Sequence, residues 1–132
     1  MATAARTVRK TILVADDNPL IRQTLSLWLE GFPEFAPIVL ANNGSEAVEK
    51  AVLHEPDLAI LDMCMPVMDG LEAARRLKLV LPQLPIIIFS LHGETMRMKR
   101  EVLESWGISA VVKKEDTTRL VEKMRELLHL AS

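Results

Sequence analysis

Five short apolar runs alternate along the chain with five segments of helical periodicity, and this alternation restricts the fold more than any other feature. The runs are nearly continuous and rich in Ile, Val and Leu: TILVA (11–15), PIVLA (37–41), DLAIL (57–61), PIIIFS (85–90) and SAVVK (109–113). Such runs are typical of parallel strands that are buried on both faces. We therefore expect one parallel sheet with helices on both of its faces.

The helices are predicted from their apolar stripes and from residues that favour helix ends. Four of them should begin after a capping side chain, at Asn18, Asn43, Asp69 and Asp116. The remaining helix is predicted for about 93–105, where charged residues interrupt the apolar positions. Strict alternation of strands and helices favours right-handed crossovers in an α/β fold. We expect a doubly wound, flavodoxin-like sheet of five parallel strands in the order 2-1-3-4-5.

The length and charge of the chain favour one soluble domain. With 132 residues, we expect a loose leader over 1–10 and a single domain over 11–130. The formal net charge of −2 argues against direct binding to nucleic acid phosphates. The single cysteine fits a reducing compartment. Because the sequence shows neither a signal peptide nor a long apolar span, we expect a cytoplasmic protein without a membrane anchor.

Acidic residues follow two of the predicted strands. Asp16 and Asp17 end the first strand, and Asp62 ends the third. In the expected order these strands are neighbours at the point where the strand order reverses, which is where ligands bind in open α/β sheets. Three carboxylates held close together repel one another unless a cation is present. Their hard oxygen ligands favour Mg²⁺, and a carboxylate beside Mg²⁺ can act as a nucleophile that forms an aspartyl phosphate.

The fourth and fifth strands end in residues that suit phosphate chemistry. Ser90 ends the fourth strand, and its hydroxyl could hydrogen-bond a phosphoryl oxygen. The fifth strand ends in Lys113 and Lys114, and a Lys ammonium there could neutralise phosphoryl charge. Because side chains alternate along a strand, only one of the two lysines can point into the site.

Four motifs, ILVADDN, LDMCMPVMDG, IIIFSLH and GISAVVKK, resemble the receiver domain of two-component response regulators, the family of the chemotaxis protein CheY. The resemblance extends from about Thr11 to Leu130. It implies that a sensor histidine kinase transfers a phosphoryl group to Asp62. Further site residues implied by the resemblance are the Mg²⁺ ligands Asp16, Asp17, Asp62 and the backbone carbonyl of Cys64, the switch hydroxyl of Ser90, and the phosphoryl partner Lys114, which the family spacing from Gly107 selects over Lys113.

Two positions depart from the commonest family pattern and bear on the output. Val111 stands where many receivers carry an aromatic switch residue, and Leu91 follows Ser90 where a small residue is usual. We therefore expect the phosphorylated state to be read through the loop after Ser90 and a face formed by the helix at about 93–105, the strand at 109–113 and the helix that follows Asp116. This face would support homodimerisation or partner binding. Ser-x-His after strand 4 and Lys-Glu after strand 5 resemble receivers of NarL-type transcription factors, which carry a C-terminal output domain that this chain does not show.

Two other functions compete with the signalling switch. A Mg²⁺-dependent phosphohydrolase similar to the haloacid dehalogenase group would form an aspartyl phosphate, but it usually has a second Asp where Cys64 stands. A receiver-like interaction module that is never phosphorylated would be expected to have lost some acidic or Lys positions. We favour the switch, and we expect no enzymatic activity beyond promotion of its own phosphorylation and dephosphorylation.

Overall fold

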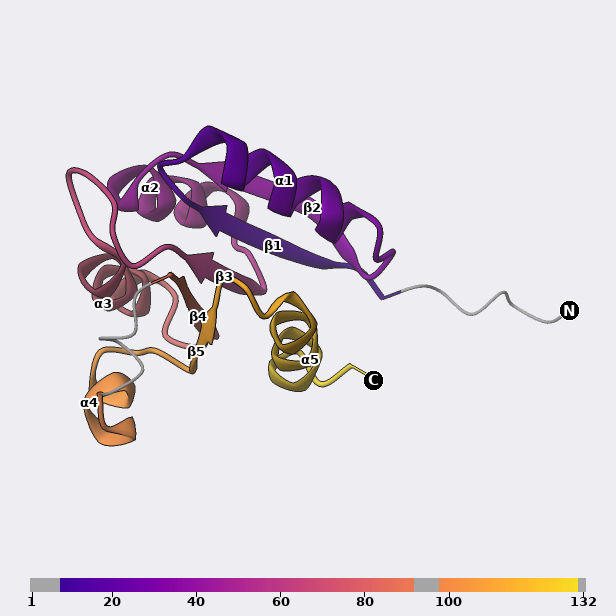
Figure 1. Cartoon of the computed structure of the whole chain (residues 1–132). Helices are drawn as coiled ribbons and strands as arrows, with labels where there is room; N and C mark the ends of the chain where they lie inside the picture. Colours follow the sequence, from indigo (N-terminus) through magenta and orange to yellow (C-terminus); the bar gives the residue numbers. More distant parts are fainter. Residues whose placement is uncertain (1–7, 92–97, 131–132) are drawn as a thin grey trace, which may run out of the picture.

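A computed structural model describes residues 8–91 and 98–130, which form one five-stranded parallel sheet surrounded by helices (Figure 1). The strand order is β2-β1-β3-β4-β5. This order confirms the prediction and makes β1 and β3 neighbours. The strands are β1 (Lys10–Ala15), β2 (Phe35–Ala41), β3 (Leu58–Leu61), β4 (Ile86–Ser90) and β5 (Ala110–Lys113).

Four of the five helices begin at the capping residues that the sequence predicts. The side chains of Asn18, Asn43, Asp69 and Asp116 each accept a hydrogen bond from a backbone N–H of the first helical turn. No helix in the described part of the chain could cross a membrane. The helices are α1 (Pro19–Glu30), α2 (Gly44–His54), α3 (Gly70–Val80), α4 (Arg100–Ser105) and α5 (Thr117–Leu127).

The core consists of two layers, one on each face of the sheet. Ile12 and Val14 of β1 pack in one cluster with residues of α1 and α5, whereas Leu13 and Ala15 pack in a second cluster with residues of α2 and α3. All four side chains are at most 1% exposed. The continuous apolar runs are therefore explained, because successive strand residues enter opposite layers and both layers exclude water.

Several predicted element boundaries differ from the structure. β2 begins at Phe35 rather than at Pro37, and β1 already includes Lys10, whose backbone N–H donates to the carbonyl of Glu34 at 2.7 Å. Within the described residues the fourth helix begins at Arg100, because Lys99 has an extended backbone and provides no capping side chain. Residues 1–7 of the predicted leader and 93–97 of the predicted helix lie outside the described residues.

Candidate functional site

Three carboxylates meet at the carboxyl ends of β1 and β3. Asp16 follows β1, and its N–H donates to the carbonyl of Ala41 at 3.2 Å. Asp62 follows β3, and its N–H donates to the carbonyl of Ala15 at 2.9 Å. Carboxylate oxygens of Asp16, Asp17 and Asp62 all lie within 4.8 Å of one another. The sheet ladder therefore continues one residue beyond each strand and places the three acids where the sequence predicts them.

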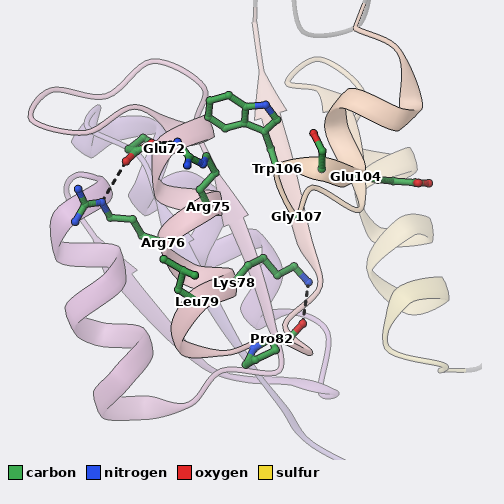
Figure 2. Close-up of a pocket in the computed structure, with 10 residues that line it drawn as sticks. Glu72, Arg75, Arg76, Lys78, Leu79, Pro82, Glu104, Trp106 and Gly107 are labelled. Atoms are coloured by element: carbon green, nitrogen blue, oxygen red, sulfur yellow. Dashed lines mark hydrogen bonds and ion pairs between the residues drawn. The ribbon is translucent and has the colours of Figure 1, made fainter.

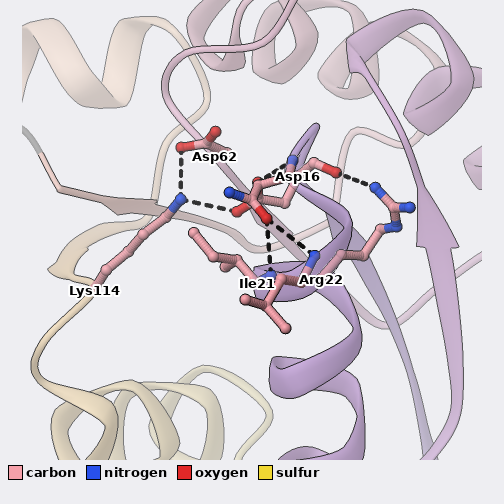
Figure 3. A network of polar contacts seen from close by, with 7 residues as sticks. Asp16, Ile21, Arg22, Asp62 and Lys114 are labelled. Atoms are coloured by element: carbon pink, nitrogen blue, oxygen red, sulfur yellow. Dashed lines mark hydrogen bonds and ion pairs between the residues drawn. The ribbon is translucent and has the colours of Figure 1, made fainter.

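Lys114 closes this cluster from the end of β5 (Figure 3). Its Nζ donates to Asp16 Oδ2 at 2.8 Å and forms an ion pair with Asp62 Oδ1 at 3.1 Å. The three side chains are 8%, 4% and 12% exposed respectively. Lys113 is exposed instead. The structure thus brings Lys114, and not Lys113, to the acidic cluster.

Burial and the neighbouring charges shift two pKa values in the cluster. The pKa of Asp62 is raised, first by burial and then by the nearby charge of Asp16, although the bond to Lys114 opposes the shift. For Lys114, burial lowers the pKa, but the hydrogen bonds to Asp16 and Asp62 outweigh it, so that its pKa is raised overall. Lys114 is therefore a cation at neutral pH.

Asp16 is held at every polar atom (Figure 3). Its carboxylate accepts from the backbone N–H of Asn18 at 2.9 Å and from Lys114, its N–H donates to Ala41, and its carbonyl accepts from Arg22 Nη1 at 2.7 Å. Asn18 also caps α1 with its side chain. Because Asp16 is only 3% exposed, these bonds satisfy polar atoms that water cannot reach freely.

A small cavity of about 150 Å³ opens beside the cluster. Asp17 lines it and is exposed, and its carboxylate has no hydrogen bond or ion pair to any residue in 8–91 or 98–130. Cys64 also lines the cavity with an exposed side chain, while metal binding by its backbone carbonyl stays a prediction. The remaining lining residues are Asp16, Asn18, Ile21, Asp62, Leu91 and Lys114.

The predicted switch residues occupy different places. Ser90 is 2% exposed, and its carbonyl accepts from the backbone N–H of Lys114 at 3.0 Å, so that the ends of β4 and β5 are joined beside the cavity. Leu91 lines the cavity and is 65% exposed. Val111 does not reach it. Val111 instead lines a groove of about 380 Å³ that α4, β5 and α5 enclose.

Sequence reasoning missed two residues that position this site. The first is Gly70, where a Cβ would lie 2.3 Å from the carbonyl oxygen of Asp62. Only glycine allows this close approach. The Asp69-Gly70 pair is a usable signal for a tight turn, but not for this contact. The bond from Arg22 to Asp16 left no sequence signal, because a long side chain on a helix can reach many partners.

A separate groove of about 680 Å³ lies between α3 and the end of α4 (Figure 2). The guanidinium of Arg75 lies over the ring of Trp106 at 4.9 Å from its centroid. The Lys78 ammonium donates to backbone carbonyls of Leu84 and Pro82, and burial lowers its pKa. The same lysine packs against Gly107. Side chains of α3 therefore hold the end of α4.

The chemistry of the acidic cluster fits a divalent cation. Three carboxylates face one ammonium, and formal charges of −3 and +1 leave −2. One divalent ion would neutralise that charge. The donors are carboxylate oxygens, which Mg²⁺ prefers. Asp16, Asp17 and Asp62 are therefore suitable residues to hold it.

The chain belongs to the response regulator receiver domain family, whose model matches residues 12–125. Among solved structures, it is similar to the response regulator TrrA of Thermotoga maritima in complex with Mg²⁺ and BeF, with 34% identity, a TM-score of 0.78, and coverage of 89% of this chain and 98% of that one. It is also similar to a LuxR-family response regulator of Aurantimonas, with 26% identity, a TM-score of 0.81, and coverage of 92% and 86%.

Curated relatives include a protein-glutamate methylesterase/protein-glutamine glutaminase of Carboxydothermus hydrogenoformans, which is 34% identical over 93% of this chain. The match covers 36% of that relative, so the chain spans about a third of its length. The family match and the structural neighbours show that the chain functions in phosphorylation-dependent two-component signalling. The interpretation as a NarL-type regulator stays a prediction, because the chain is similar both to a LuxR-family response regulator and to a protein-glutamate methylesterase/protein-glutamine glutaminase.

Proposed function

We propose that Asp62 is the phosphoryl acceptor of this receiver, and that a sensor histidine kinase is the donor. One observation carries the proposal. Asp62 lies in the cavity with Lys114 Nζ 3.1 Å from Oδ1 and with two further carboxylates around it. Asp16 is the less suitable acceptor, because its polar atoms are all engaged and it is more deeply buried.

The transfer converts the Asp62 carboxylate into an acyl phosphate. A carboxylate oxygen attacks phosphorus and forms an O–P bond, while the N–P bond of a phosphohistidine breaks and the imidazole keeps the electron pair. Lys114 remains charged and pairs with the phosphoryl oxygens. A bound Mg²⁺, held by Asp16, Asp17, Asp62 and the Cys64 carbonyl, would neutralise phosphoryl charge. Ser90 would donate its hydroxyl to a phosphoryl oxygen.

The decisive experiment is phosphorylation with acetyl phosphate and Mg²⁺, followed by mass spectrometry. The protein should gain one phosphoryl mass, and Asp62→Asn should gain none, because an amide cannot form the acyl phosphate. Asp57→Asn is a matched control. Asp57 precedes β3 at the amino end of the strands, away from the acidic cluster, and it accepts a hydrogen bond from the Thr11 N–H. Labelling of Asp62→Asn at the normal rate would refute the assignment. Steady release of phosphate from simple esters would favour the phosphohydrolase alternative.

We further infer that the output runs through Ser90 and Leu91 to the face formed by α4, β5 and α5. Phosphorylation adds about −1.5 to −2 charge, which draws Ser90 toward Asp62 while Lys114 pairs with the phosphoryl group. Because Val111 has no ring to swing inward, the loop and α4 move instead. This face then supports a homodimer, a partner or an attached output domain. Beryllofluoride should change hydrogen exchange in residues 90–105 and should change the sedimentation of the protein. If hydrogen exchange changed only around Asp17 and Asp62, an output through Ser90, Leu91 and α4 would be excluded.

A further inference from the structure

Asp17 is placed only through its backbone. Its exposed carboxylate has no bonding partner in the part of the chain that the structure describes, in contrast to the fully bonded Asp16. The peptide that joins the two residues is planar, so its orientation fixes where the Cα of Asp17 lies. The carbonyl oxygen of this peptide accepts a hydrogen bond from Arg22 Nη1 at 2.7 Å (Figure 3).

We propose that Arg22 is a positioning residue for the cation site: by holding the carbonyl of Asp16, its guanidinium sets where the Asp17 carboxylate meets a divalent cation. The inference rests on the proposed function only in that a cation binds the acidic cluster. Arg22 does not line the cavity and lies on the side of Asp16 opposite Lys114. It therefore acts through the backbone and touches neither the cation nor the phosphoryl group.

The other bonds of the turn do not replace this contact. Asn18 holds one carboxylate oxygen of Asp16 and Lys114 holds the other, but neither bonds the peptide between Asp16 and Asp17. Arg22 is located one helical turn after Asn18, so α1 and the acidic turn are joined as one unit. Without the guanidinium, a largely buried carbonyl would lose its donor, and the peptide would be free to rotate.

The test is the Mg²⁺ dissociation constant, measured by calorimetry on the whole chain and on three variants. Arg22→Met should weaken binding about 10-fold, as is typical when a group that orients a metal ligand is removed. Arg22→Lys should stay within about 3-fold of the parent, because only one nitrogen of Arg22 makes the bond. Arg76→Met is the matched control. It removes a guanidinium that pairs with Glu72 on α3, and it should bind normally.

A second readout separates positioning from general damage. In phosphorylation by acetyl phosphate, Arg22→Met should need about 10-fold more Mg²⁺ for half-maximal rate, yet reach the parent rate at saturation. Circular dichroism checks the fold, and Arg22→Ala, which also lacks a donor, replaces Arg22→Met if that variant unfolds. Mg²⁺ binding within 2-fold of the parent, or equal losses in the Met and Lys variants, would overturn the proposal. If the parent binds Mg²⁺ but is not labelled on Asp62, the proposed function fails while this inference stands.

Discussion

The acidic site and α4 are built in opposite ways. Asp16 and Asp62 extend buried strands of the sheet, and Asp16 is bonded at every polar atom. In contrast, α4 has no buried residue and no capping side chain, and α3 holds its end by a few side chains (Figure 2). The contrast is consistent with the proposed roles of the two regions. Phosphoryl chemistry would need fixed geometry, whereas an output element would have to move at a small free-energy cost.

The largest expected effect is at Gly70. In Gly70→Ala the new Cβ would lie 2.3 Å from the carbonyl oxygen of Asp62, which belongs to rigid backbone. We expect a loss of about 3 kcal/mol in the free energy of unfolding, measured in urea, together with slower phosphorylation. Gly31→Ala is the control, because its closest contact would be 3.2 Å. Equal stability of these two variants would show that the acidic end of the sheet is not rigid.

A substitution at Gly107, which follows α4, should lower the free energy of unfolding less than one at Gly70. Gly107 has a positive φ of 81°, and its neighbour is the flexible side chain of Lys78. Gly107→Ala should therefore cost about 1–2 kcal/mol of unfolding free energy, mainly through backbone strain. Phosphorylation by acetyl phosphate should keep its rate. A cost above that of Gly70→Ala would reverse the proposed ranking of the two regions.

The charge of Asp62 should make the metal-free protein depend on pH. Its pKa is raised in the folded state, first by burial, so the ionised carboxylate destabilises folding. This destabilisation is absent below the unfolded pKa and grows as pH rises through the folded pKa. Asp62→Asn should therefore be more stable than the parent at pH 7 without Mg²⁺, and the difference in unfolding free energy between the two proteins should disappear in acid. Thermal melts across pH measure both. A difference in stability between Asp62→Asn and the parent that does not change with pH would exclude ionisation of Asp62 as its cause.

The smallest expected effect concerns the stacking of Arg75 on Trp106. Arg75→Met should lower the unfolding free energy by only about 0.5–1 kcal/mol, because the pair is partly exposed. Hydrogen exchange should nevertheless become faster in residues 98–107 and stay unchanged around Asp16 and Asp62. Arg76→Met, which loses a similar surface ion pair but no ring contact, is the control. Faster exchange throughout the sheet would show that α4 and the site form one cooperative unit.

The fold was predictable because its signals are local. Continuous apolar runs identify strands buried on both faces, and Asn18 and Asp116 reveal helix starts by their residue type and position. The acidic cluster was predictable for a related reason, since parallel strands bring their carboxyl ends to one edge.

What escaped prediction depends on contacts between distant segments. Lys10 joins β1 through a backbone bond to Glu34, which no property of Lys10 encodes. The close approach of Gly70 to Asp62 and the reach of Arg22 to Asp16 likewise depend on how elements pack. The start of α4 was misplaced because Lys99 offers no cap and its neighbouring residues give mixed periodicity.

The attachment of α4 by Arg75, Lys78 and Trp106 has an evolutionary consequence. None of these side chains lines the acidic cavity, so a substitution among them leaves the reacting groups in place. In descendants of one ancestral domain, substitutions at these positions would therefore alter how α4 is held without changing the acidic cluster. Under the proposed function, a duplicated copy of such a domain would keep its phosphorylation site. It would need changes only around α4 to recognise a different partner.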